Sequence, residues 1–263
     1  MTTDATLDVI RIQDTTWHIL NATAAGRQRL LAALPEAERE IVAAGTTGPG
    51  FDIEQARRRK TLANVLTVSY PVTFFAYYAR TGGEGLHSLL EGEHWRGRSA
   101  QPGSAFPPAA STSAAFSAHL RTGGWPDRQE EWVREAFRFE DGLLFGATMP
   151  GAARTRLVPG AWAVEASFDV PEYATVLRER GATDPWPEAL LLTKRRPAPI
   201  AVVSVPADGR VRRLRLRGDE VAGLRWLWDD RLPVPEDAAG SVSVRRAVAA
   251  GIVAAGIVDG GRL

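Results

Sequence analysis

Apolar residues recur every three or four positions through much of residues 1–145, which is the spacing of one buried helix face. A helix opening near Phe51 should take Asp52 as its N-cap. It should end before Tyr70-Pro71, because the residue before a proline avoids helical geometry. The helices expected here cover Ala25–Leu34, Glu36–Ala44, Phe51 to about Ser69, Phe74–Arg80 and Asp127–Glu140, the last with Trp132, Ala136 and Phe139 on one face.

The pattern changes after Gly142 to one typical of strands. Trp162, Val164, Ala166 and Phe168 alternate with other residues, which predicts a half-buried strand. Further strands are expected at Leu190–Arg196, Pro199–Val205 and Val211–Arg217, and helices at Val170–Arg180, Asp219–Trp228 and Ser243–Ala255, with Ser243 as N-cap. The last three of these strands and the last two helices, in residues 190–255, form a winged-helix-like unit. Such a unit binds either a nucleic acid or an extended peptide.

The predicted fold class is therefore α+β, with a helical lobe followed by an α+β lobe. The helical lobe should cover residues 1–145 and the α+β lobe residues 146–263. The dipeptide Asp208-Gly209 favours a hairpin turn between the last two strands, because glycine tolerates a positive φ.

The amino-acid composition limits the cellular location of this chain and the chemistry it can carry out. It contains no cysteine, which excludes disulfides, thiol nucleophiles and thiolate metal sites and fits a reducing cytoplasm. Its net charge of +1 gives no overall field to attract nucleic acid. No apolar run approaches the roughly 20 residues that span a bilayer, and Met1–Asp4 does not open a secretory signal. We expect a cytoplasmic protein that does not contact membranes.

No residue pattern points to catalysis. The histidines His18, His87, His94 and His119 lack metal-binding spacing, and surface or capping roles are expected for them. Glu131 and Glu135 interleave with arginines, as on an exposed helix face. Neither a phosphate-binding glycine motif nor a nucleophile elbow is present. The sequence therefore predicts a protein that is not an enzyme and binds no metal or cofactor.

Two basic clusters stand out. Arg57–Lys60 spans a whole helix circumference, so a solvated face is the simple interpretation and an acidic partner surface the alternative. Arg213, Arg215 and Arg217 share one strand face, which would suit polyanions or acidic peptides. An arginine-rich face exposed to solvent and balanced by nearby carboxylates remains the other interpretation.

The side chains of the last predicted helix favour peptide binding over DNA binding. Among its side chains only Arg245 and Arg246 are basic, whereas a DNA-recognition helix usually offers several polar groups to base edges. A small, smooth helix beside an edge strand suits an extended peptide better, with the peptide added beside Pro199–Val205 or Val211–Arg217. The expected peptide-binding residues are Ile200, Val202, Arg213, Arg215, Arg217, Arg245, Val248 and Ile252. A winged-helix transcriptional regulator is the alternative.

Part of the chain resembles a known family. The segment Ala56–Pro71, with its Arg, Leu and Asn positions before Tyr-Pro, is similar to a stretch of the MbnC-like partner subunits. Phe116–Leu120, Pro126, Trp132 and the segment from Gly218 to Leu227 resemble later parts of the same family. These subunits act in methanobactin and 3-thiaglutamate-type peptide maturation, beside TIM-barrel multinuclear iron oxidases.

The resemblance implies a role for each lobe. The C-terminal lobe would bind the leader of a ribosomally made precursor peptide, and the helical lobe would bind the oxidase in a heterodimer. Iron is expected in the partner enzyme and not in this chain, which would be a required accessory subunit without catalytic residues. The residues assigned to oxidase binding are Arg57, Arg58, Asn64, Tyr70 and Phe74.

Overall fold

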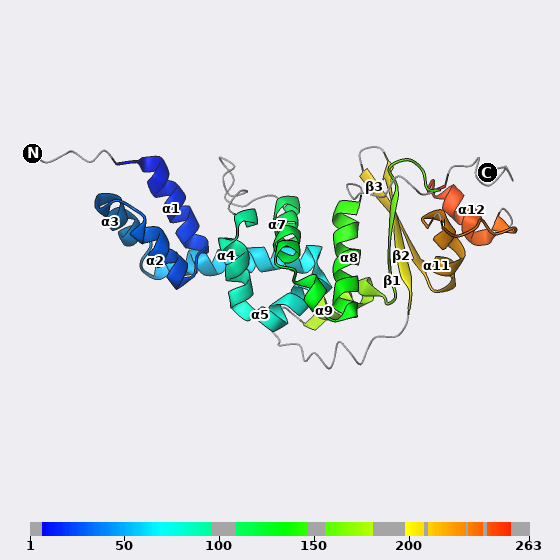
Figure 1. The fold of residues 1–263 in the computed structure, drawn as a ribbon, viewed down its shortest axis with the longest axis horizontal. Helices are drawn as coiled ribbons and strands as arrows, with labels where there is room; N and C mark the ends of the chain where they lie inside the picture. Colours follow the sequence, from blue (N-terminus) through cyan, green and yellow to red (C-terminus); the bar gives the residue numbers. More distant parts are fainter. Residues whose placement is uncertain are drawn as a thin grey trace, which may run out of the picture. The chain divides into compact units, whose positions relative to one another are not determined.

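The computed structural model describes residues 7–95, 109–146, 156–180, 198–207, 210–229, 231–238 and 241–253. They form an α+β fold in which helices predominate and a small antiparallel sheet lies in the second half (Figure 1). The chain divides into two compact units, Met1–Arg128 and Gln129–Leu263. The expected strand at 190–196 and the Asp208-Gly209 turn lie outside the described residues.

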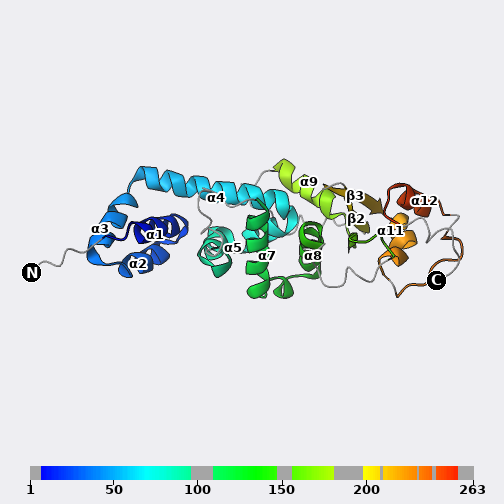
Figure 2. The same ribbon diagram turned by 90° about the horizontal axis from the view of Figure 1, so that it is seen from above.

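The first unit is helical. Within it, α1, α2 and α3 group together and pack against the long helix α4 (Figure 2). The helices expected at 25–34, 36–44 and 51–69 are confirmed, with α4 ending before Tyr70-Pro71 as predicted, whereas the helix expected at 74–80 runs from Pro71 to Glu91. The predicted N-cap Asp52 is wrong, because α4 begins at Pro49 after Gly48, whose φ is 97°. The elements are α1 (Val9–Asn21), α2 (Ala24–Ala32), α3 (Glu36–Gly45), α4 (Pro49–Ser69), α5 (Pro71–Glu91), α7 (Ala109–Thr122) and the 3₁₀ helix η1 (Pro126–Arg128).

Aromatic side chains form part of the core of this unit. The ring of Phe116 lies 5.3 Å from Tyr70, 6.0 Å from Phe74 and 5.5 Å from Tyr77, in edge-to-face arrangements. Tyr77 also contacts Trp125 edge-on, with 5.5 Å between ring centroids. Such pairs stabilise by about 0.5–1.5 kcal/mol each beyond the area they bury. This cluster joins α5, α7 and the turn that follows α7.

The second unit is built around a three-stranded sheet of order β1-β2-β3, antiparallel throughout. The strands predicted at 199–205 and 211–217 and the short helix at 170–180 are confirmed, and the strand predicted at 162–168 is confirmed as far as Ala166. The elements are α8 (Glu131–Phe145), β1 (Trp162–Ala166), α9 (Val170–Arg180), β2 (Ile200–Ala207), β3 (Arg210–Arg217), α11 (Asp219–Leu224), the 3₁₀ helix η3 (Arg225–Leu227) and α12 (Val242–Ala249).

Helix α8 belongs to this second unit, so the unit boundary lies at Arg128–Gln129 and not after residue 145 as expected. Its glycine Gly142 lets β1 approach closely: a Cβ at that position would lie 2.3 Å from Cγ1 of Val164. The indole Nε1 of Trp162 donates to the carbonyl of Gly142 at 2.9 Å. Along the chain, α8 directly follows the helices of the first unit. In space it packs on β1, and it therefore belongs to the second unit.

The sheet is covered on both faces, with α8 on one side and α11 and α12 on the other (Figure 1). Strand residues alternate between the two faces. Trp162, Val164, Ile200 and Val202 lie on the α8 side. On the other face, Ala201, Val203, Val205 and Leu216 belong to a hydrophobic core that the sheet shares with α11, η3 and α12. The residues that complete this core include Val221, Leu224, Trp226, Leu227, Val244, Ala247, Ile252 and Val253.

Helix α12 is shorter than expected. It ends at Ala249 rather than Ala255, because Gly251 adopts a φ of 71° and closes a Schellman motif. The N–H of Ile252 donates to the carbonyl of Ala247, and the N–H of Gly251 to that of Val248, both at 2.9 Å. The N-cap is Ser241 and not Ser243, and Ile252 follows the helix instead of lying on it.

Candidate functional site

Strand β2 cannot accept a further strand, because both of its edges are paired. Val202, for example, lies opposite Val164 of β1 and Arg215 of β3. The predicted peptide-binding residues Ile200 and Val202 are 0% and 5% exposed. Of the two edges considered from the sequence, the Pro199–Val205 edge is therefore excluded in this structure, and the β3 edge remains.

The outer edge of β3 has no neighbouring strand among the described residues. The N–H of Gly218 donates to the carbonyl of Pro199 at 2.9 Å, which continues the β2–β3 register. In an antiparallel pair, every second residue turns its N–H and C=O toward the partner and the intervening residues turn theirs away. The backbone groups of Val211, Arg213, Arg215 and Arg217 therefore face outward. No strand of the described residues pairs with them.

A cavity of about 250 Å³ lies between β3 and the end of α12. Aliphatic side chains from β2, β3 and the segment after α12 line it, and two alanines stand at its helix side. The small alanine side chains leave space that a larger residue at the end of α12 would fill. The lining residues are Val205, Arg212, Arg213, Leu214, Ala249, Ala250 and Ile252.

Two predicted peptide-binding residues, Arg213 and Ile252, therefore line one cavity. Val248 packs against the adjoining core, and Arg245 is exposed on α12. Sequence reasoning missed Val205, Arg212, Leu214, Ala249 and Ala250. The run Ala249-Ala250-Gly251 was the available signal, since it predicts a helix end without bulk, but its value depends on β3 lying beside it.

The three arginines on the other face of β3 all have partners. Arg215 and Arg217 both pair with the buried carboxylate of Asp169, Arg217 at 2.8 Å. Arg213 donates to the main-chain carbonyl of Leu143 at 3.1 Å. The row is therefore not a free patch: Arg215 and Arg217 share one carboxylate, and Arg213 is bonded to a main-chain carbonyl.

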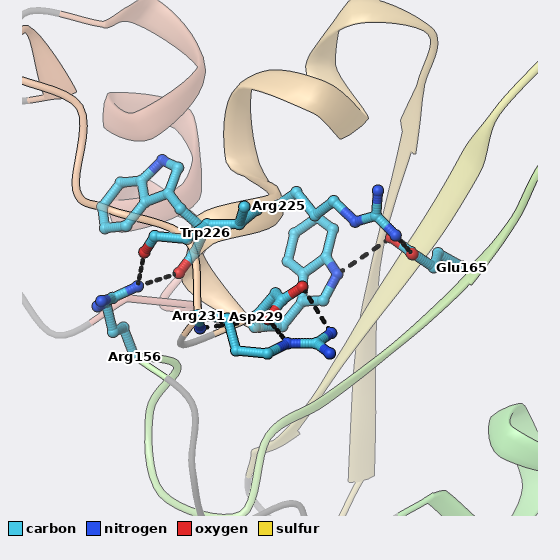
Figure 3. A network of polar contacts seen from close by, with 8 residues as sticks. Arg156, Glu165, Arg225, Trp226, Asp229 and Arg231 are labelled. Carbon is cyan, nitrogen blue, oxygen red and sulfur yellow. Dashed lines mark hydrogen bonds and ion pairs between the residues drawn. The ribbon is translucent and has the colours of Figure 1, made fainter.

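At the opposite edge of the sheet, a polar network joins β1 to η3 (Figure 3). Glu165 accepts from the guanidinium of Arg225 and, at 3.3 Å, from the indole of Trp228. Because Glu165 is on β1 and its donors are on and just after η3, these bonds hold η3 against the sheet. They help to fix the core on the face that also carries the cavity.

Arginines also hold the chain that follows η3 (Figure 3). Arg156 donates to the carbonyls of Trp226 at 2.6 Å and Leu232 at 3.1 Å. Arg231 donates to both carboxylate oxygens of Asp229, at 2.7 and 2.9 Å, and these hydrogen bonds lower the pKa of Asp229. This network fixes backbone and contains no open site.

The residues assigned to oxidase binding are not all at the surface. Tyr70 and Phe74 are 0% and 2% exposed and belong to the aromatic core, so a partner cannot contact them in this conformation. Arg57 and Arg58 both bond Glu54, at 2.8 Å, and thereby lower the pKa of that carboxyl. Asn64 is exposed on α4.

Arg58 also stacks over the ring of Trp17, with 3.9 Å between its guanidinium carbon and the ring centroid. Its side chain is only 12% exposed, so it joins α1 to α4. Within the expected oxidase-binding set, Arg57 and Asn64 are the side chains exposed at the surface.

The expectation of surface or capping roles for the histidines is wrong for His119. The hydroxyl of Tyr77 donates to the carbonyl of Gly85 at 2.9 Å and lies 3.1 Å from Nε2 of His119. Since a phenol has one proton, Nε2 of His119 must donate in this pair. Burial lowers the pKa of His119, and the nearby His94 adds to this effect. No group of three metal-ligating side chains occurs in the described ranges.

The chain matches no protein-family model and no curated protein. None of the helices within the described part of the chain has the length and apolar character needed to cross a membrane.

Proposed function

We propose that this chain is a non-catalytic subunit that binds a precursor peptide and presents it to a multinuclear iron oxidase. One observation carries the proposal: the outer edge of β3 is unpaired among the described residues, and a cavity lies beside it at the end of α12. An extended peptide can bind such an edge by adding a strand, with backbone bonds giving affinity and the cavity giving selectivity.

The dimensions of the edge fit this role. Strand β3 has eight residues, of which Val211, Arg213, Arg215 and Arg217 turn backbone groups outward. Strand β1 at the other edge has five residues, so its pairing surface is shorter. Binding at β3 would hold the precursor in one register. Tethering the peptide in this way would raise the concentration of its modifiable residue at the oxidase.

The features of α12 favour peptide over DNA. Its exposed side chains are Val242, Arg245, Arg246 and Ala249, and Arg246 is bonded to Glu220 of α11. Two of these four side chains are aliphatic and a third, Arg246, already bonds a carboxylate, so α12 offers few groups for base edges to bond. DNA binding by a winged helix would also require several phosphate contacts, with an affinity that falls steeply with salt.

The test is a reconstitution of this chain with a candidate multinuclear iron oxidase and a candidate precursor peptide. We expect a heterodimer with the oxidase, and oxidation of the peptide only when all three components are present. Ala249→Trp should fill the cavity, abolish peptide binding and abolish oxidation, while leaving the heterodimer intact. Ala222→Trp is the matched control, because Ala222 is an exposed alanine on α11 that does not line the cavity.

Two results would contradict the proposal. One is full oxidation of the peptide without this chain. The other is equal loss of peptide binding in Ala249→Trp and Ala222→Trp, which would mean that the cavity plays no part. Salt-sensitive binding of duplex DNA with no peptide binding would instead support the regulator.

A further inference from the structure

The two faces of β3 differ in chemistry, and a strand added beside it would meet both. On one face lies the cavity formed with α12. On the other face lies the row Arg213, Arg215 and Arg217. Successive side chains of any strand point to opposite faces of its sheet. A bound peptide would therefore direct every second side chain toward the cavity and the remaining side chains toward the arginines.

We infer that the site selects a peptide strand in which aliphatic and acidic residues alternate. The inference rests on the proposed function and adds the chemical class of peptide that the site accepts. It further assigns Leu214, Ala249 and Ile252 to the choice of the aliphatic residue, and Arg215 and Arg217 to the choice of the acidic residues.

The aliphatic preference follows from the walls of the cavity. Val205, Leu214 and Ile252 contribute branched hydrocarbon, and Ala249 and Ala250 bring no hydrogen-bonding side chain to the helix side; Arg212 and Arg213 complete the lining at β3. An aliphatic side chain placed against these hydrocarbon walls gains free energy by leaving water. One position of the peptide should therefore require Val, Ile or Leu.

The acidic preference follows from the charge of the row. Arg215 and Arg217 share one carboxylate, that of Asp169, and Arg213 donates to a main-chain carbonyl, so the bonds of the row hold three guanidinium groups with a single carboxylate. The side chains of Arg215 and Arg217 are 39% and 59% exposed. A guanidinium has five N–H donors, so a bond to Asp169 leaves others for a second carboxylate.

Neighbouring strands place their side chains within reach of each other. Directly opposed side chains of adjacent strands have Cβ atoms about 5 Å apart, so a carboxylate on the added strand lies beside an arginine of β3. Opposite charges in such pairs attract, and like charges repel. Acidic residues at every second position would thus follow the arginine row, while basic residues there would be rejected.

The experiment measures binding of the full chain to fluorescently labelled synthetic peptides of about nine residues, the length that covers β3. Four peptides are compared: alternating Val-Glu, alternating Val-Ser, alternating Val-Lys, and a peptide with the Val and Glu residues in separate blocks. We expect alternating Val-Glu to bind about tenfold more tightly than Val-Ser. Val-Lys and the block peptide should bind more weakly still.

Variants of the chain assign the preference to residues. Arg217→Gln should reduce the advantage of Val-Glu over Val-Ser, and Ala249→Trp should weaken both peptides. Arg231→Gln is the matched control, because its side chain is 85% exposed and bonds Asp229 away from β3. It should change neither affinity.

The outcomes separate this inference from the proposed function. If Val-Ser or Val-Lys binds as tightly as Val-Glu, and Ala249→Trp abolishes that binding, the inference is overturned and peptide binding stands. If none of the four peptides binds but the natural precursor does, the inference is again overturned. If neither the peptides nor the precursor binds, both the inference and the proposed function are wrong.

Discussion

Arg217 at the end of β3 bonds the carboxylate of Asp169 at 2.8 Å, and Asp169 is buried at the start of α9. The same carboxylate accepts from the backbone N–H of Glu172 at 3.0 Å, which caps the helix. One side chain therefore fixes α9 and two arginines of the edge strand. The edge strand β3 and the helix that follows β1 are therefore coupled through Asp169.

Replacing Asp169 should loosen this part of the second unit. Asp169→Asn keeps an oxygen that can cap α9 but removes the charge that holds Arg215 and Arg217. We expect a loss of about 1–3 kcal/mol in the free energy of unfolding, measured by urea denaturation. Partial exposure of both arginines should keep the loss toward the low end. Asp229→Asn, which breaks a pair with the exposed Arg231, should cost less; an equal cost would show that Asp169 has no special role.

The approach of α8 to β1 should depend on the missing side chain of Gly142. A methyl group there would meet Cγ1 of Val164 at 2.3 Å, so Gly142→Ala should destabilise the chain by about 1–3 kcal/mol. Gly223→Ala on α11 is the matched control, because its new methyl group would meet no atom within 4 Å. That variant should gain up to about 1 kcal/mol from reduced freedom of the unfolded chain. Thermal unfolding of both variants checks the difference, and equal melting temperatures would refute the close packing.

The backbone alternation along β3 predicts opposite effects of proline at neighbouring positions. The N–H of Val211 faces outward, so Val211→Pro should leave the melting temperature almost unchanged and weaken peptide binding severalfold. The N–H of Arg212 faces β2, so Arg212→Pro should break a ladder bond and lower stability by about 1–3 kcal/mol. Thermal unfolding and peptide titration measure the two effects. The reverse order of stabilities would mean that the outward edge has been assigned to the wrong residues.

The burial of His119 should make stability depend on pH. Its pKa in the folded chain lies below the ordinary 6.5 because burial disfavours the charged form. Below about pH 6.5 the unfolded chain binds the proton more readily, so stability should fall as pH drops toward the folded pKa. In His119→Gln this fall, measured by urea denaturation at pH values from about 7.5 to about 5, should become smaller. His87 also has a lowered pKa, chiefly through burial, so the double variant with His87→Gln should be flatter still. An unchanged slope in the double variant would contradict the assignment.

Local patterns in the sequence were sufficient for most helices and strands. The ends of α4 and α9 and the positions of β2 and β3 follow from periodicity, proline and turn residues, which act over a few neighbours. The end of α12 was missed for a local reason, since Gly251 was treated as part of the helix although it takes a positive φ. The same run of small residues holds two of the cavity-lining positions.

Only the tertiary structure shows which strand edge lacks a partner in the described part of the chain, and what the arginines contact. Strand β2 is central because it pairs with β1, which lies more than 30 residues earlier in the chain. The alternation of residues within β2 is the same for a central strand and an edge strand, so it could not predict this pairing. The burial of Tyr70 and Phe74 likewise depends on Phe116, which lies on another helix. The sequence by itself determined an α+β chain with a basic strand beside a small, bare helix. Contacts between distant residues decided that this strand is an edge, that Asp169 holds two of its arginines, and that the alanines of α12 leave a cavity next to it.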